Sequence, residues 1–127
     1  MEVVLPHTSF TVRRVYSQNS RDVDNEVLEG EAPMSQQQQD YYKAIIGDGL
    51  ARVSVGRDMS EMDFGSGGKV FVSVSLVCNQ DAQTVNYAVG LAAQIADYQI
   101  EQHFQQMKQR CEAMGLLKPA APARPAY

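Results

Sequence analysis

Residues 67–100, GGKVFVSVSLVCNQDAQTVNYAVGLAAQIADYQI, join a strand pattern directly to a long helix pattern. Every second residue of the segment 69–78 is apolar: Val70, Val72, Val74, Leu76 and Cys78. This period of two predicts a half-buried strand, with one face on a core and the other largely in water. Residues 51–57, ARVSVGR, alternate in the same way, so the two segments are expected to pair as an antiparallel hairpin. The residues between them, DMSEMDFGSGG, are too many for a tight turn and predict a flexible tip.

The helix pattern that follows runs over about 81–114. Asn79 or Asp81 can cap its N-terminus, and Gly115 can end it. Such a helix is about 50 Å long at about 1.5 Å per residue, whereas a compact domain of about 100 residues has a radius of gyration of only about 13 Å. Between Val85 and Ile100 apolar residues surround the helix, and a sheet can cover only one side. The helix is therefore expected to extend past its own domain or to pack on another chain.

Beyond Ile100 the helix is polar except for one seam: Phe104, Met107, Cys111 and Met114. Their spacing of three, four and three residues is typical of a coiled coil and suits a single partner helix. The partner is either the N-terminal helix of the same chain or the same helix of a second copy. The second alternative predicts an oligomer interface made of Val85, Val89, Ala92, Ile95, Ala96, Ile100, Phe104, Met107, Cys111 and Met114.

Three further segments complete the expected fold. Residues 9–17, SFTVRRVYS, are rich in β-branched and aromatic residues and predict a strand at the edge of the sheet. Residues 17–34 carry many acids and turn formers without an apolar period, which predicts a mobile acidic loop. Residues 35–47 predict a helix, because Ser35 and Gln38 form a capping box and Gly47 or Gly49 can end it.

Together these segments predict an α+β fold. A small antiparallel sheet, made of the N-terminal strand and the hairpin 51–57/69–78, is expected to pack on the long C-terminal helix, with the helix 35–47 beside it. The chain has 127 residues, so residues 1–117 are expected to form one domain. Residues 118–127, KPAAPARPAY, are expected to form a disordered tail.

Composition limits the function classes. The net charge of −4 argues against a general phosphate-backbone binder, although the acidity is concentrated in residues 22–31. No apolar run approaches the roughly 20 residues that span a bilayer, and the N-terminus lacks a signal-peptide pattern, so we expect a cytoplasmic protein without a membrane partner. Cys78 and Cys111 belong to no metal-binding motif and are expected to be small buried hydrophobic residues.

No pattern indicates catalysis. The segment GSGGK at 65–69 lacks the upstream glycine and the following Ser or Thr of a phosphate loop, since Asp63 and Val70 stand at those positions, and a strand follows. Neither His7 nor His103 sits beside a plausible nucleophile or carboxylate partner, and His103 is expected at the surface. We therefore expect no enzyme activity, no cofactor and no metal. Two acid groups miss the calcium-loop spacing and are expected to be solvated: Asp22, Asp24 and Glu26, and Asp58, Glu61 and Asp63.

The leading hypothesis is a non-enzymatic, self-associating interaction or scaffold protein that forms a homo-oligomer through the long helix. The alternative is an accessory protein that binds single-stranded nucleic acid on the wet face of the hairpin. There an exposed aromatic ring can stack a base while cations hold phosphates. Its candidate residues are Arg52, Arg57, Lys69 and Phe71. A third hypothesis, an enzyme whose site is assembled between subunits, stays open because one sequence cannot show such a site.

Overall fold

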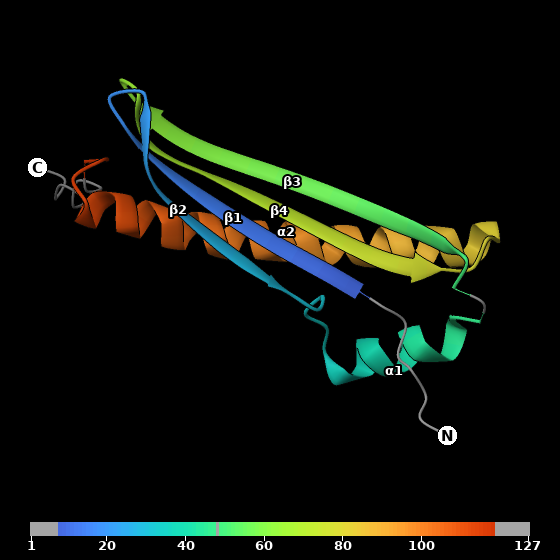
Figure 1. The fold of residues 1–127 in the computed structure, drawn as a ribbon. Coiled ribbons are helices and arrows are strands. Elements are labelled where there is room, and N and C mark those ends of the chain that lie inside the picture. Colours follow the sequence, from blue (N-terminus) through green and yellow to red (C-terminus); the bar gives the residue numbers. More distant parts are fainter. Residues whose placement is uncertain (1–7, 48, 119–127) are drawn as a thin grey trace, which may run out of the picture.

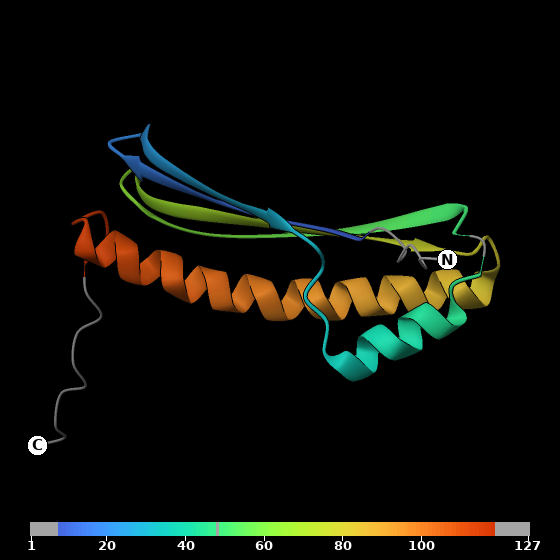
Figure 2. The ribbon, with the colours of Figure 1, turned by 60° about the horizontal axis from the view of Figure 1, so that its bottom comes forward.

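The protein is an antiparallel sheet of four strands with a long helix along one face, as seen in a computed structural model that describes residues 8–47 and 49–118. The order along the chain is β1 (Thr8–Gln18), β2 (Arg21–Gly30), α1 (Gln36–Ile45), β3 (Ala51–Asp63), β4 (Ser66–Cys78) and α2 (Ala82–Ala113). In the sheet the strands lie in the order β2-β1-β4-β3 (Figure 1). Figure 2 shows both helices on the same side of the sheet. The predicted α+β class, with the sheet packed on a long C-terminal helix, is confirmed.

The β3–β4 hairpin is confirmed, but its expected flexible tip is wrong. Both strands are longer than predicted, and Asp63 pairs with Ser66 across a turn of two residues. Phe64 and Gly65 have φ angles of 49° and 80°, so both central residues have the positive φ that a type I′ turn requires. Residues 58–63 show no clear alternation of apolar and polar residues. This end of the edge strand is mostly exposed, so few of its side chains have to be apolar.

Strand β2 replaces the loop that was predicted for residues 17–34. It pairs with β1 after a turn at Asn19 and Ser20, whose φ angles are 51° and 67°. The prediction failed because β2 is an edge strand with little buried apolar surface, so it has no apolar period to read. The pairing also makes β1 a central strand, with β2 on one side and β4 on the other, instead of the predicted edge strand.

Helix α2 is only slightly longer than the sheet on which it lies. Its 32 residues span about 48 Å at about 1.5 Å per residue, and the 13 residues of β4 span about 43 Å at about 3.3 Å per residue. The expected extension of the helix past its own domain is therefore wrong, and Figures 1 and 2 show the sheet running alongside almost all of α2. The residues of α2 that are buried lie mainly on one face: Thr84, Ala88, Leu91, Ala92, Ile95, Ala96, Ile100, His103, Met107 and Cys111.

Glycine lets the C-terminal end of α2 approach β4 closely. A Cβ atom added at Gly68 would lie 2.3 Å from the Met107 sulfur and 3.1 Å from the Cys111 sulfur. Met107 and Cys111 are fully buried and 3.4 Å apart at sulfur. The seam that was expected to meet another helix therefore packs, in these two residues, against the chain's own strand. Cys78 and Cys111 are both buried, as expected.

Helix α1 lies beside the N-terminal half of α2. It begins with the predicted capping box of Ser35 and Gln38. Tyr42 is buried and donates a hydrogen bond of 2.7 Å to the carbonyl oxygen of Val77, which ties α1 to the end of β4. Burial raises the pKa of Tyr42 to about 12, so this donor keeps its proton at neutral pH. Neither α1 nor α2, the helices of the described residues, combines the length and apolar content needed to span a membrane.

Candidate interaction surfaces

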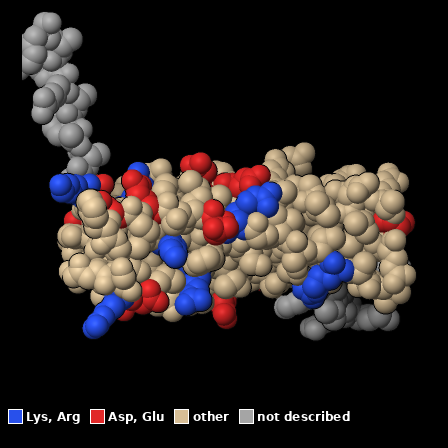
Figure 3. All heavy atoms as spheres, turned by 90° about the horizontal axis from the view of Figure 1, so that it is seen from above, with Lys and Arg blue, Asp and Glu red and all other residues tan. Residues whose placement is uncertain are grey.

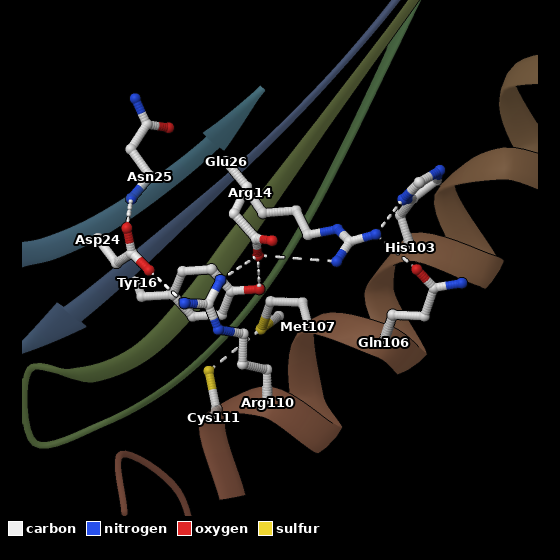
Figure 4. A network of polar contacts seen from close by, with 10 residues as sticks. All are labelled: Arg14, Tyr16, Asp24, Asn25, Glu26, His103, Gln106, Met107, Arg110 and Cys111. Carbon is white, nitrogen blue, oxygen red and sulfur yellow. Dashed lines mark hydrogen bonds and ion pairs between the residues drawn. The ribbon is translucent and has the colours of Figure 1, made fainter. Parts of the chain in front are cut away.

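A cluster of polar side chains joins the β1–β2 hairpin to α2 (Figure 4). Its members are Arg14, Tyr16, Asp24, Glu26, His103, Gln106 and Arg110. We call these residues the polar cluster. The strand residues point toward the helix because alternate positions of β1 and β2 face α2, which places Arg14 opposite Glu26 and Tyr16 opposite Asp24. Two of its members, Asp24 and Glu26, lie in the segment that was expected to be a mobile acidic loop.

Arg110 is the centre of the polar cluster. It forms an ion pair with Glu26 at 2.6 Å and a second one with Asp24, and its guanidinium lies over the ring of Tyr16, 4.7 Å from the ring centroid. Hydrogen bonding to Glu26 raises the pKa of Arg110. Burial alone would raise the pKa of Glu26, but the hydrogen bond from Tyr16 and the charge of Arg110 hold it below its ordinary value. Asp24 and Glu26 are therefore partners of α2, and the expectation that these two acids are simply solvated is wrong.

His103 is buried, with 8% of its surface exposed, although the sequence predicted a surface position. Arg14 Nη2 lies 2.8 Å from His103 Nδ1, so Nδ1 is the acceptor and carries no proton in this arrangement. Arg14 also donates to Gln106. Burial, together with the charge of Arg14, lowers the pKa of His103. The imidazole therefore serves as a neutral acceptor inside the interface between β1 and α2.

Acid should weaken the fold through His103. The unfolded chain binds a proton on this residue near pH 6.5, whereas the folded chain binds it only at lower pH, so the free energy of unfolding falls as the pH drops below 6.5. Urea denaturation at pH 7.5, 6.5, 5.5 and 5.0 measures the decline. His103→Gln keeps an acceptor without a titrating group, and its stability should stay level over this range. An equal decline in His103→Gln would show that another group is responsible.

The polar cluster ties the β1–β2 hairpin to α2, and a pocket beside it is lined in part by Arg14, Glu26 and His103. Among the described residues every buried side-chain nitrogen or oxygen atom has a hydrogen-bond partner. The same part of the chain holds no group of three or more His, Cys, Asp or Glu residues that could bind a metal ion. His7 lies outside the described residues. Further candidate surfaces are those that the fold leaves uncovered.

The first of these is the face of the sheet opposite the helices. Phe71 lies near its centre with 42% of its surface exposed, directly between Arg13 on β1 and Asp58 on β3. Lys69 and Arg52 share this face, and Arg52 donates to the Ser75 hydroxyl at 3.0 Å. These positions agree with the predicted wet face of the hairpin. Arg13, which the sequence reading did not include, is brought beside Phe71 by the central position of β1.

Arg57 differs from the other predicted nucleic-acid residues. Its partner across the strands is Val72, which is buried against the helix side, and its guanidinium forms an ion pair of 2.8 Å with Asp97 of α2. Lys108 of α2 reaches Glu61 of β3 in the same way, at 3.1 Å. Both pairs fasten the helix to the edge strand. Figure 3, viewed from the β3 side, shows charges of both signs mixed over the hairpin end and few charges over the α1 end.

Most of the residues predicted for an oligomer interface lie inside the monomer. Those buried against the chain's own sheet are Ala92, Ile95, Ala96, Ile100, Met107 and Cys111. Val85 and Phe104 are half-buried, and Val89 and Met114 are exposed. These six side chains are already packed inside the monomer and present little surface to a second copy. A contact between folded copies therefore depends on surface that the monomer leaves exposed, which includes Val89 and Met114.

A groove between the start of α1 and the middle of α2 is such a surface. It is lined by Pro33, Met34, Ser35, Gln38, Gln94, Ile95, Tyr98 and Gln99, none of which is charged. We call it the uncharged groove. Tyr98 stands at its side with 63% of its surface exposed. The sequence reading placed none of these residues except Ile95 in an interface, although the lack of any charged residue between Ala82 and Ala96 was visible.

The tip of the β3–β4 hairpin is the most exposed apolar feature of the described chain. Phe64 is 98% exposed, and the neighbouring Met62 is also exposed. The tip is held from the side by the other hairpin, since Ser20 donates its backbone N–H to the Gly65 carbonyl at 2.8 Å and Asn19 donates to the Ser66 hydroxyl at 3.1 Å. Figure 1 shows the two hairpin ends together at one end of the molecule. We call residues 62–65 the Phe64 tip.

Comparisons of the chain with protein-family models, with curated proteins and with solved structures found no match in any of the three.

Proposed function

We propose that the protein is a non-enzymatic interaction protein that associates with further copies of itself through the uncharged surface of α1 and α2. The observation that carries this proposal is the uncharged groove with the exposed Tyr98 beside it. The exposed side of a surface helix is normally rich in charged residues. In α2 the first 15 residues, Ala82 to Ala96, contain none.

Two physical arguments favour a second copy as the partner. The centres of protein interfaces are depleted in charged residues and enriched in tyrosine and methionine, and Tyr98 and Met34 line the groove. Each copy carries a net charge of −4, so two copies repel each other in general. A contact that lacks carboxylates on one side keeps this repulsion small.

Gly90 supports the same surface. It lies in the N-terminal third of α2, is exposed, and an added Cβ atom would meet no atom within 4 Å. A glycine in an exposed helix interior costs about 1 kcal/mol relative to alanine. Packing inside the monomer does not require a glycine at this position. The close approach of another molecule to the helix backbone would explain why a side chain is absent here. Gly90, Gln94 and Tyr98 follow one another at intervals of four residues and therefore lie along one side of the helix.

Light scattering tests the proposal directly. The wild-type protein should show a mass that rises above 14.0 kDa as its concentration increases through the micromolar range. A mass that stays at 14.0 kDa up to several hundred micromolar would contradict self-association.

Single-stranded nucleic acid is a second candidate ligand, because Phe71 is exposed on the uncovered face of the sheet. Gly56 leaves a hollow beside the Phe71 ring, which is bordered by Thr11, Arg13 and Ser73. A planar base could stack on the ring while Arg13 and Lys69 face its phosphates. Against this ligand stands Asp58, which flanks Phe71 on its other side.

Fluorescence polarisation with a labelled single strand separates this candidate from self-association. If the face binds bases, Phe71→Ala should weaken binding by about 5- to 100-fold, the usual effect of losing one stacking partner. Phe64→Ala is the matched control, since it removes an equally large exposed ring from a different surface. Equal binding by Phe71→Ala and wild type would exclude this face as the site.

A further inference from the structure

The fold itself explains neither the backbone conformation of Phe64 nor the exposure of its side chain. Its φ angle is 49°, in the left-handed region that bulky residues avoid. The first central position of a type I′ turn is usually Asn, Asp or Gly, and Asn-Gly is the most favourable pair. The side chain also gains nothing from packing, because it is 98% exposed. A strained and fully exposed aromatic residue is best explained by a contact outside the chain.

The Phe64 tip is also held rigidly, which an anchor residue requires. The hydrogen bond from Ser20 to Gly65 and the one from Asn19 to Ser66 brace the turn from the neighbouring hairpin. A Cβ atom added at Gly65 would lie 2.4 Å from the Ser20 hydroxyl oxygen, so the two tips are in close contact. A preorganised aromatic side chain loses little entropy when it binds and is typical of interface hot spots.

We propose that Phe64 of one copy inserts into the uncharged groove of the next copy. This inference rests on the proposed self-association and names its two surfaces. The groove offers an apolar floor and sides of Met34, Ile95 and Tyr98. It has no charged lining residue, so the carboxylate of Asp63, next to Phe64, meets no like charge there. An aromatic ring beside Tyr98 adds a favourable ring–ring contact.

The two surfaces lie on different parts of the molecule, which determines the type of assembly. The tip is at the hairpin end, and the groove lies near the middle of α2, where the chain from β2 to α1 crosses the helix (Figure 2). A contact between two different surfaces is heterologous, so it leaves a free tip and a free groove at the ends of every dimer. Repetition of such a contact produces a ring or an open chain of copies.

Two variants and their mixture test the proposal. Phe64→Asn removes the ring and installs the preferred Asn-Gly turn, so it should be monomeric in light scattering. At a concentration where wild type is also monomeric, its Tm should be about 3–5 °C above that of wild type. Tyr98→Asp places a charge at the groove and should also be monomeric while its circular dichroism spectrum is unchanged. Mixed in equal amounts, the two variants should form a dimer of about twice 14.0 kDa, because one supplies the tip and the other the groove.

The outcomes separate this inference from the proposed function. A Phe64→Asn variant with the same concentration-dependent mass as wild type would overturn the role of Phe64 and leave self-association standing. Loss of association in Phe64→Asn but not in Tyr98→Asp would place the tip in another site and overturn the groove as its receptor. Two monomeric variants whose mixture stays monomeric would exclude the heterologous contact. A wild-type protein that is always monomeric would overturn both the inference and the proposed function.

Discussion

Gly67→Ala is expected to lower the free energy of unfolding by about 3 kcal/mol, through backbone strain and a clash that cannot relax locally. Gly67 has a φ angle of 146°, which side chains rarely adopt. An added Cβ atom would lie 2.0 Å from the carbonyl oxygen of Glu61, a backbone atom of the paired strand. Because Glu61 belongs to the β3–β4 ladder, relief of the clash must break pairing next to the turn. Urea denaturation followed by circular dichroism measures the loss.

Gly56→Ala is the matched control for this prediction. It makes the same chemical change in the same hairpin, but the nearest atom to its Cβ would be a carbonyl oxygen at 3.8 Å, an ordinary contact distance. Its free energy of unfolding should stay within about 0.5 kcal/mol of wild type or rise slightly, because alanine restricts the unfolded chain. Equal losses in the two variants would mean that the close approach at Gly67 does not determine the stability of the hairpin.

The elements predicted correctly from the sequence are those with strong local signals. The capping box of Ser35 and Gln38 gave the start of α1, and Asp81 caps α2 as one of the two predicted candidates. The alternation in β4 was clear because this central strand buries a whole row of apolar side chains on one face. Such signals act within one element, so a sequence reading can detect them without knowing the fold.

Strand β2 was missed because its stability comes from residues far away in the chain. Asp24 and Glu26 of β2 are paired with Arg110, which lies 84 residues after Glu26, and the backbone of β2 pairs with β1. His103 was misplaced for the same reason, since its partner Arg14 is on β1. Long-range ion pairs and hydrogen bonds leave no periodic pattern at either end, so only the assembled fold reveals them.

The predicted overhang of α2 was wrong because the strands are longer than expected. Residues 58–68 were assigned to a loop, and the helix was compared with a compact domain instead of a sheet of 13-residue strands. In the structure Met59 and Gly68 continue the ladder, and the sheet reaches both Met107 and Cys111. Most of the apolar residues of α2 thus belong to the core of the monomer, while Val89 and Tyr98 stay exposed. The contact proposed here depends instead on the absence of charged residues from the groove and on the turn conformation of Phe64. Neither feature points to an interface until the structure shows which of these residues are exposed.

Ile95→Asp is expected to unfold the protein, with a loss of more than about 4 kcal/mol. Ile95 is 5% exposed and belongs to the core between α2 and the sheet. Removing such a side chain costs about 2–5 kcal/mol by itself, and the new carboxylate would be buried without a partner, which adds a further cost. Small domains have a total stability of only about 5–15 kcal/mol. The circular dichroism spectrum at 25 °C should therefore show a largely unfolded chain.

Tyr98→Asp places the same carboxylate three residues later on α2 and should leave the spectrum unchanged. Tyr98 is exposed and does not belong to the core, so its replacement removes little intramolecular contact. The pair of variants divides the helix into a side that folds the monomer and a side that is free to meet another copy. A folded Ile95→Asp protein would show that the sheet does not depend on α2 at this point. The burial of Ile95 in a core shared by α2 and the sheet would then have to be abandoned.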